Sequence, residues 1–161
     1  MSLRPEFLPE SAGCRNLLVD SNLLVLYVVG AVNRRRIAQF KRTEKYNPAD
    51  YELLTMLMSE FTSLYTVPQV MADLVGRERI FAREVLKRMI CEVTESAVSS
   101  RDASDHQIFA NLGLTDAAIA SAARGHDCFV LTDDLPLYVW LNQVGVPAAN
   151  YTHLRERFGT L

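Results

Sequence analysis

Cysteine and histidine are scarce in this sequence of 161 residues, which contains three of each. Cys14, Cys91 and Cys128 are far apart, lie beside apolar residues and form no C-x-x-C motif. This pattern favours reduced thiols in a cytoplasmic protein over a disulfide framework. The histidines are equally scattered, so neither residue type predicts a zinc site.

The sequence also lacks a strong charge of either sign and a long hydrophobic run. Its formal net charge is −2, so a bound polyanion would have to meet a local basic patch. The most apolar stretch, residues 17–32, contains Asp20 and is too short to span a membrane, and no basic leader precedes it. We therefore expect a protein without membrane association, whose length and 49% hydrophobic content suit one compact core.

Segments typical of strands and helices alternate along the chain. Continuous apolar runs at residues 16–19 and 128–131 are typical of strands buried on both faces of a parallel sheet, and each run precedes a helical pattern. The alternation predicts an α/β fold with neighbouring parallel strands. Residues 1–15 are expected to form an extended N-terminal arm and residues 16–161 a single domain. Further strands are expected at 64–67 and 148–151, and helices at 23–32, 49–61, 69–75, 77–88, 101–112, 114–123, 135–143 and 153–158.

Acidic residues follow two of the expected strands directly. Asp20 comes after residues 16–19, and Asp133 and Asp134 come soon after residues 128–131. The carboxyl ends of parallel strands meet at one edge of a sheet, where ligands bind in open α/β folds. The alternative for each of these acids is a structural one, because aspartate is a common N-cap of a following helix.

Two further acids can reach the same edge from helices. Asp116 stands in the first turn of an expected helix with Thr115 as its N-cap, and Asp73 lies within the expected helix 69–75. Helix capping is the alternative role for Asp116, and simple solvent exposure is the alternative for Asp73. Together the five acids predict a cluster at the carboxyl edge of the sheet.

A cluster of carboxylates requires a counter-charge. Each close pair should repel by roughly a few kcal/mol at an effective dielectric of about 20. Oxygen ligands without cysteine or histidine favour Mg²⁺ or Mn²⁺ over zinc. Such ions polarise a phosphodiester, lower the pKa of a bound water and stabilise the leaving oxygen, so the cluster predicts metal-dependent phosphodiester hydrolysis.

Two basic segments offer contacts for phosphates. Arg34, Arg35 and Arg36, followed by Lys41, Arg42 and Lys45, form a predicted basic ridge. An amphipathic helix over residues 77–88 places further basic side chains outward, including Arg77 and Arg79. An ordinary solvated surface is the alternative for both segments.

Four segments, in this order, resemble the signatures of PIN domains: LLVDSNLL at 17–24, TVPQVMADLVG at 66–76, LGLTDAAIASAA at 112–123 and VLTDDLPL at 130–137. PIN domains are mostly endoribonucleases and include the toxins of VapBC modules. The resemblance covers residues 16–151 and implies a Rossmann-like, three-layer α/β/α sandwich with a mostly parallel sheet. It also implies a Mg²⁺ or Mn²⁺ site.

The same resemblance assigns roles to individual residues. It implies that Asn22 and Thr132 support the site through hydrogen bonds. The second acid is most often glutamate in the family, whereas Asp73 is shorter by one methylene. The acids that would bind the metal and act in catalysis are Asp20, Asp73, Asp116 and Asp134, with Asp133 as a neighbour or substitute of Asp134.

The leading hypothesis is therefore a metal-dependent endoribonuclease, with the toxin of a toxin–antitoxin module as one form of it. Arg34, Arg35, Arg36, Arg77 and Arg79 would contact the RNA backbone. The resemblance also implies an antitoxin-like protein partner and a homodimer, while the cysteine pattern indicates a cytoplasmic location.

Other functional classes fit the sequence less well. The main alternative is a catalytically silent PIN-like module that binds RNA or a protein. A phosphatase of the HAD type would need a second aspartate where Asn22 stands, and a receiver domain would need a lysine late in the sheet, whereas no lysine follows Lys87.

Overall fold

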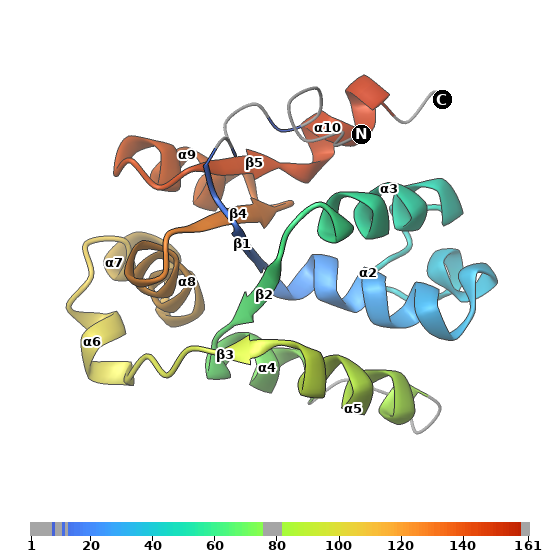
Figure 1. Ribbon diagram of the computed structural model, residues 1–161, viewed down its shortest axis with the longest axis horizontal. Coiled ribbons are helices and arrows are strands. Elements are labelled where there is room, and N and C mark those ends of the chain that lie inside the picture. The colour runs from blue at the N-terminus through green and yellow to red at the C-terminus, as the bar shows by residue number, and fades with distance from the viewer. Residues whose placement is uncertain (1–7, 9–10, 12, 76–81, 159–161) are drawn as a thin grey trace.

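The computed structural model describes residues 8, 11, 13–75 and 82–158, with Asp73 and Val75 described by their backbone alone (Figure 1). Arg77 and Arg79 lie outside the described residues, as does the side chain of Asp73. Among the described helices, none combines the length and the hydrophobicity that crossing a membrane requires.

A parallel sheet forms the centre of the molecule. Over the described residues it has five strands in the order β3-β2-β1-β4-β5, and every pairing is parallel (Figure 1). Helices flank the sheet, which confirms the predicted α/β, Rossmann-like three-layer sandwich. The strands are β1 (Asn16–Val19), β2 (Ser63–Thr66), β3 (Thr94–Glu95), β4 (Cys128–Thr132) and β5 (Ala148–Asn150).

The helices agree with most of the predicted ones. Asn47 caps α3 in a capping box with Asp50, and a proline stands in the first turn of α9. The helices are α2 (Ser21–Val32), η2 (Arg34–Gln39, a 3₁₀ helix), α3 (Pro48–Ser59), α4 (Pro68–Val75), α5 (Arg83–Glu92), α6 (Ser100–Ser104), α7 (Phe109–Leu112), α8 (Leu114–Gly125), α9 (Leu135–Gln143) and α10 (Tyr151–Phe158).

The buried core explains why the apolar runs become strands. All five residues of β4 are buried, as are Leu17, Leu18 and Val19 of β1. A strand with helices on both faces has no polar side, so its residues do not alternate. The N-terminal arm contributes to this core, because Leu8 is 1% exposed.

Strand order sets the position of the candidate site. From β1 the chain moves to β2 and β3 on one side, and later to β4 and β5 on the other side. This reversal makes the junction of β1 and β4 a topological switch point, the usual location of a ligand site in such sheets. The register pairs Val19 with Leu131, so Asp20 lies beside Thr132 and Asp133.

Two local predictions require correction. The helix predicted at 101–112 is divided into α6 and α7, because the His106 side chain accepts a hydrogen bond from the Ile108 backbone and competes with the helical pattern. Thr115 is not the N-cap of α8, which begins after Gly113 at φ 99°. In addition, residues 92–100, where no strand was predicted, contain the two-residue edge strand β3.

Candidate active site

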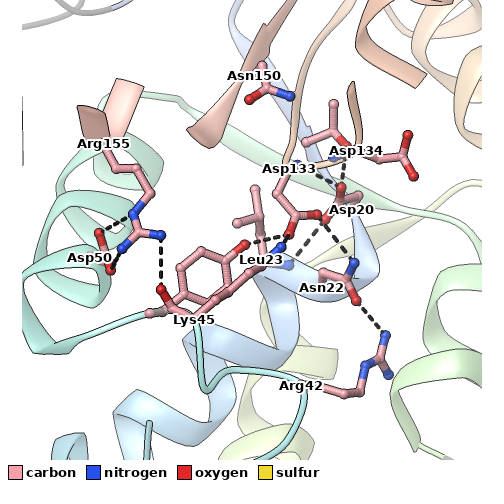
Figure 2. Close-up of polar contacts among 12 residues, drawn as sticks. Asp20, Asn22, Leu23, Arg42, Lys45, Asp50, Asp133, Asp134, Asn150 and Arg155 are labelled. Atoms are coloured by element: carbon pink, nitrogen blue, oxygen red, sulfur yellow. Dashed lines mark hydrogen bonds and ion pairs between the residues drawn. The ribbon is translucent and has the colours of Figure 1, made fainter. Parts of the chain in front are cut away.

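Asp20 connects the ends of β1 and β4 at the switch point. Its Oδ1 accepts a hydrogen bond from the Leu23 backbone at 3.1 Å, which makes it the N-cap of α2. Its Oδ2 accepts hydrogen bonds from the Thr132 hydroxyl and from the Asp133 backbone, the latter at 3.1 Å (Figure 2). The side chain is therefore buried and has a protein donor at each oxygen.

Thr132 joins the two acids that follow the strands. Its hydroxyl donates to Asp20 and accepts a hydrogen bond from the Asp134 backbone at 3.0 Å. Thr132 is fully buried, and its hydroxyl links the residue after β1, Asp20, to the N-cap residue of α9, Asp134. The supporting role proposed for Thr132 thus has a direct geometric basis.

Asp133 is surrounded by donors. Its Oδ2 accepts hydrogen bonds from the Lys45 ammonium and the Tyr46 hydroxyl, both at 2.5 Å, and its Oδ1 accepts one from the Asn22 amide at 3.3 Å. Asn22 in turn accepts a hydrogen bond from Arg42 at 2.8 Å (Figure 2). Asp133 already has a counter-ion from the protein itself.

Asp134 and Asp116 form a second pair beside the first. Asp134 is the N-cap of α9, where its Oδ1 accepts a hydrogen bond from the Leu137 backbone at 2.9 Å, and its exposed carboxylate points away from Asp133 in Figure 2. Asp116, in the first turn of α8, is close enough to Asp134 for that charge to raise its pKa. The acids thus gather in two neighbouring pairs.

The protonation of these acids follows from burial and pairing. Burial, and then the charge of Asp133, raises the pKa of Asp20 to about 7. Burial alone would also raise the pKa of Asp133. Hydrogen bonds from Lys45, Tyr46 and Asn22 outweigh this effect, so the pKa of Asp133 is lowered. Asp133 is therefore the charged member of the pair, and Asp20 is the member that takes up a proton.

The second pair behaves similarly. Burial, followed by the charge of Asp134, raises the pKa of Asp116 to about 6. A divalent cation at this edge would favour the charged forms of both Asp20 and Asp116, as a nearby positive charge does in general.

The donor set suits a hard cation. The acids supply oxygen atoms alone, which suits Mg²⁺ or Mn²⁺, and Mg²⁺ is commonly held by one or two carboxylates together with water and substrate phosphates. Asp116 and Asp134 could supply such a pair. Among the described residues, no group of three or more acidic, histidine or cysteine side chains could hold an ion.

Three arginines of the predicted ridge, Arg34, Arg35 and Arg36, lie on η2. Arg34 forms an ion pair with Glu52 at 2.5 Å and lies 4.9 Å from the centre of the Tyr51 ring. Arg35 and Arg36 are exposed on the same 3₁₀ helix. The described contacts of Arg34 are thus with α3 rather than with the acids.

Sequence reasoning missed the close partners of Asp133. Lys45 was assigned only to a general basic ridge, and Tyr46 carried no recognisable signal because it stands in a loop without periodicity. Both residues are more than 80 positions from Asp133 in sequence, so only the tertiary fold reveals the contact. The chain matches no protein-family model, and no curated protein matches it.

Proposed function

We propose that this chain is a metal-dependent endoribonuclease that hydrolyses RNA phosphodiester bonds through its aspartates. The observation that carries the proposal is the placement of Asp20, Asp133 and Asp134 after β1 and β4, on both sides of the switch point. Asp116, in the first turn of α8, lies near enough to Asp134 to be affected by its charge, which supports including it in the site. This is where a parallel α/β sheet binds ligands, and the ordered resemblance to PIN domains supports the same chemistry.

The aspartates would have different roles in metal binding. Asp116 and Asp134, with Asp73 on α4, would hold a Mg²⁺ or Mn²⁺ ion, and Asp20 would hold it directly or through water. The bound ion would polarise the phosphodiester and activate a water molecule. Thr132 and Asn22 would keep Asp20 and Asp133 in place through the hydrogen bonds described above.

An RNA cleavage assay tests this proposal. The purified protein is incubated with single-stranded RNA of mixed sequence in Mn²⁺, in Mg²⁺ and in EDTA, beside an Asp20→Asn, Asp116→Asn double variant. We expect cleavage only with metal, and a loss of at least about 100-fold in the double variant, a typical scale for removing a catalytic group. Equal cleavage in EDTA or by the double variant would exclude the proposed active site.

A suitable control is available at the opposite edge of the sheet. Asp127 is exposed and lies just before β4, whereas Asp133 lies just after it. Asp127→Asn therefore removes one acidic side chain at the amino end of β4, away from the candidate site. This variant should cleave RNA as the wild type does. Loss of cleavage in this variant as well would show that the assay responds to net charge or stability.

One observation favours a second candidate function, a catalytically silent module that binds RNA or a protein. Asp133 is neutralised by Lys45, and the described acids form pairs rather than a group of three. A silent module would bind RNA without cleaving it under any metal condition. The cleavage assay therefore separates the two candidates.

The resemblance to PIN domains extends the proposal to partners. On that basis we propose RNA as the substrate and a homodimer as the active form, with an antitoxin-like protein as the partner if the chain acts as a toxin. We propose the cytoplasm as the location because the three cysteines are widely spaced and suit reduced thiols. Size-exclusion chromatography with light scattering tests the dimer directly.

A further inference from the structure

The segment between η2 and α3 presents a lysine at the candidate site. We call residues 40–47 the site loop. Lys45 donates to Asp133 at 2.5 Å, and the Lys45 side chain is 51% exposed while that of Asp133 is 1% exposed. The carboxylate is thus covered, whereas much of the lysine faces solvent at the edge of the sheet.

The site loop is held by its own backbone. The Thr43 backbone donates to Phe40 at 2.8 Å and the Tyr46 backbone donates to Thr43 at 2.9 Å, which makes two consecutive turns. The buried Thr43 hydroxyl donates to the Ile37 carbonyl at 2.7 Å. These bonds leave the loop little freedom to carry Lys45 elsewhere.

The C-terminal helix holds the loop from outside. Arg155 of α10 donates to both carboxylate oxygens of the buried Asp50, at 2.9 and 2.7 Å, and its remaining terminal nitrogen donates to the Lys45 carbonyl at 2.9 Å (Figure 2). The Arg155 guanidinium also lies 5.2 Å from the centre of the Tyr46 ring. Lys45 is therefore fixed both at its backbone and at its ammonium.

An ammonium group that is held in place can bind an anionic ligand. Lysine has three donors, and the contact with Asp133 takes one of them. Arg42, from the same loop, is fixed nearby through Asn22. An anion that approaches the acids therefore meets a positive group held in place beforehand, which reduces the entropy lost when the anion binds.

We propose that Lys45 is a phosphate-binding residue of this site, with its ammonium held by Asp133 so that it contacts the phosphodiester backbone of RNA. The identity of the polyanion rests on the proposed function. The contact itself needs neither a metal ion nor cleavage. Asp133 in this arrangement positions Lys45 rather than binding the metal.

Metal-free RNA binding tests this inference. The affinity for a fluorescently labelled single-stranded RNA is measured by anisotropy in EDTA at several salt concentrations. The central variant is Lys45→Met with Asp133→Asn, which removes one charge of each sign and so keeps the net charge and avoids an unpaired buried carboxylate. Thermal unfolding confirms that each variant is folded.

We expect the double variant to bind RNA about five-fold to ten-fold more weakly, with the slope of log affinity against log salt reduced by about 0.7. Lys45→Arg, which keeps the charge, should retain most of the affinity. Arg101→Met removes an exposed positive charge on α6 and should change the affinity by less than about two-fold.

Three results would overturn the inference: no RNA binding by the wild type in EDTA, an unchanged affinity in the double variant, or an equal loss in Arg101→Met. Failure of the cleavage assay is a separate result. If RNA is bound through Lys45 but never cleaved, the nuclease proposal fails and the phosphate-binding residue stands.

Discussion

Asp20 has more hydrogen-bond donors around it than helix capping requires. Serine, threonine or asparagine could cap α2 through one side-chain oxygen. The second oxygen of Asp20, however, faces two donors from the end of β4, the Thr132 hydroxyl and the Asp133 backbone. Asparagine would place an amide donor against one of these donor groups, so the environment specifies a carboxyl group.

The raised pKa of Asp20 predicts how stability depends on pH. Because folding raises this pKa from 3.8 to about 7, the folded protein binds more protons than the unfolded chain between those values. The contribution of Asp20 to the free energy of unfolding should therefore fall as pH rises from about 4 to about 7, by up to about 4 kcal/mol, and then level off. Urea unfolding in EDTA across this pH range measures the effect.

The matched variant for this test is Asp20→Asn, which cannot titrate. The free energy of unfolding of this variant should change less steeply between pH 4 and 7. The pH dependence that remains should come from Asp116, whose pKa is also raised by folding. Asp127→Asn should follow the wild-type curve. Parallel curves for the wild type and Asp20→Asn would show that Asp20 does not take up the proton.

At the level of elements, the contact between α2 and α3 depends on a glycine. A Cβ added at Gly30 would lie 2.2 Å from Cδ2 of Tyr51, a ring that also stacks on Tyr27. The absence of a side chain at Gly30 therefore lets the Tyr51 ring lie directly on the α2 backbone. Close packing of this kind fixes the spacing of α2 and α3, the helices that precede and follow the segment formed by η2 and the site loop.

Gly30→Ala should lower the free energy of unfolding by about 1 to 3 kcal/mol, because the added methyl group displaces the Tyr51 ring. This loss occurs although alanine is favoured over glycine in a helix by about 1 kcal/mol. Gly125→Ala is the control, since a Cβ there meets nothing within 4 Å. If both variants are equally stable in chemical denaturation, the close packing at Gly30 does not matter.

The ion pair between α3 and α10 stabilises the site loop. Asp50 is 4% exposed and Arg155 is its paired cation, so Arg155→Met should leave a buried carboxylate without its cation. We expect the free energy of unfolding to fall by about 2 to 3 kcal/mol. This loss is at or below the lower end of the range for breaking a buried ion pair, because Arg155 is partly exposed. The variant should also weaken metal-free RNA binding, since the Lys45 carbonyl loses its donor.

Arg157→Met provides the comparison on the same helix. Arg157 is exposed and its described contact is with the Phe158 ring at 4.9 Å, so its loss should cost less than about 0.5 kcal/mol. Similar destabilisation in the two variants would mean that the effect comes from charge on α10 in general and not from the pair with Asp50.

For the whole molecule, the fold was predictable because its signals are local. Continuous apolar runs identify β1 and β4, which are buried on both faces, and Asn47 with Pro48 marks the start of α3. The edge strand β3 was not predictable, because its two residues are exposed and lack a pattern. The break between α6 and α7 was not predictable either: the His106 side chain accepts a hydrogen bond from the Ile108 backbone there, and no periodicity in the sequence marks it.

The candidate site was predictable only in part. Asp20, Asp133 and Asp134 follow two parallel strands in the sequence, and the carboxyl ends of parallel strands lie at the same edge of the sheet. Their proximity could therefore be predicted. The way in which these acids pair depends on side-chain contacts between distant segments, above all Lys45 with Asp133. No local sequence pattern encodes such a contact, and it changes the role assigned to Asp133.

We propose above all that the acids at this edge of the sheet bind a divalent cation, Mg²⁺ or Mn²⁺. The most direct measurement is calorimetric titration of Mn²⁺ into the wild type, Asp116→Asn and Asp127→Asn. We expect saturable binding to the wild type and to Asp127→Asn, and an affinity at least about ten-fold weaker for Asp116→Asn, because this variant loses a ligating carboxylate. Absence of binding to the wild type, or equal affinity in all three proteins, would contradict the proposal.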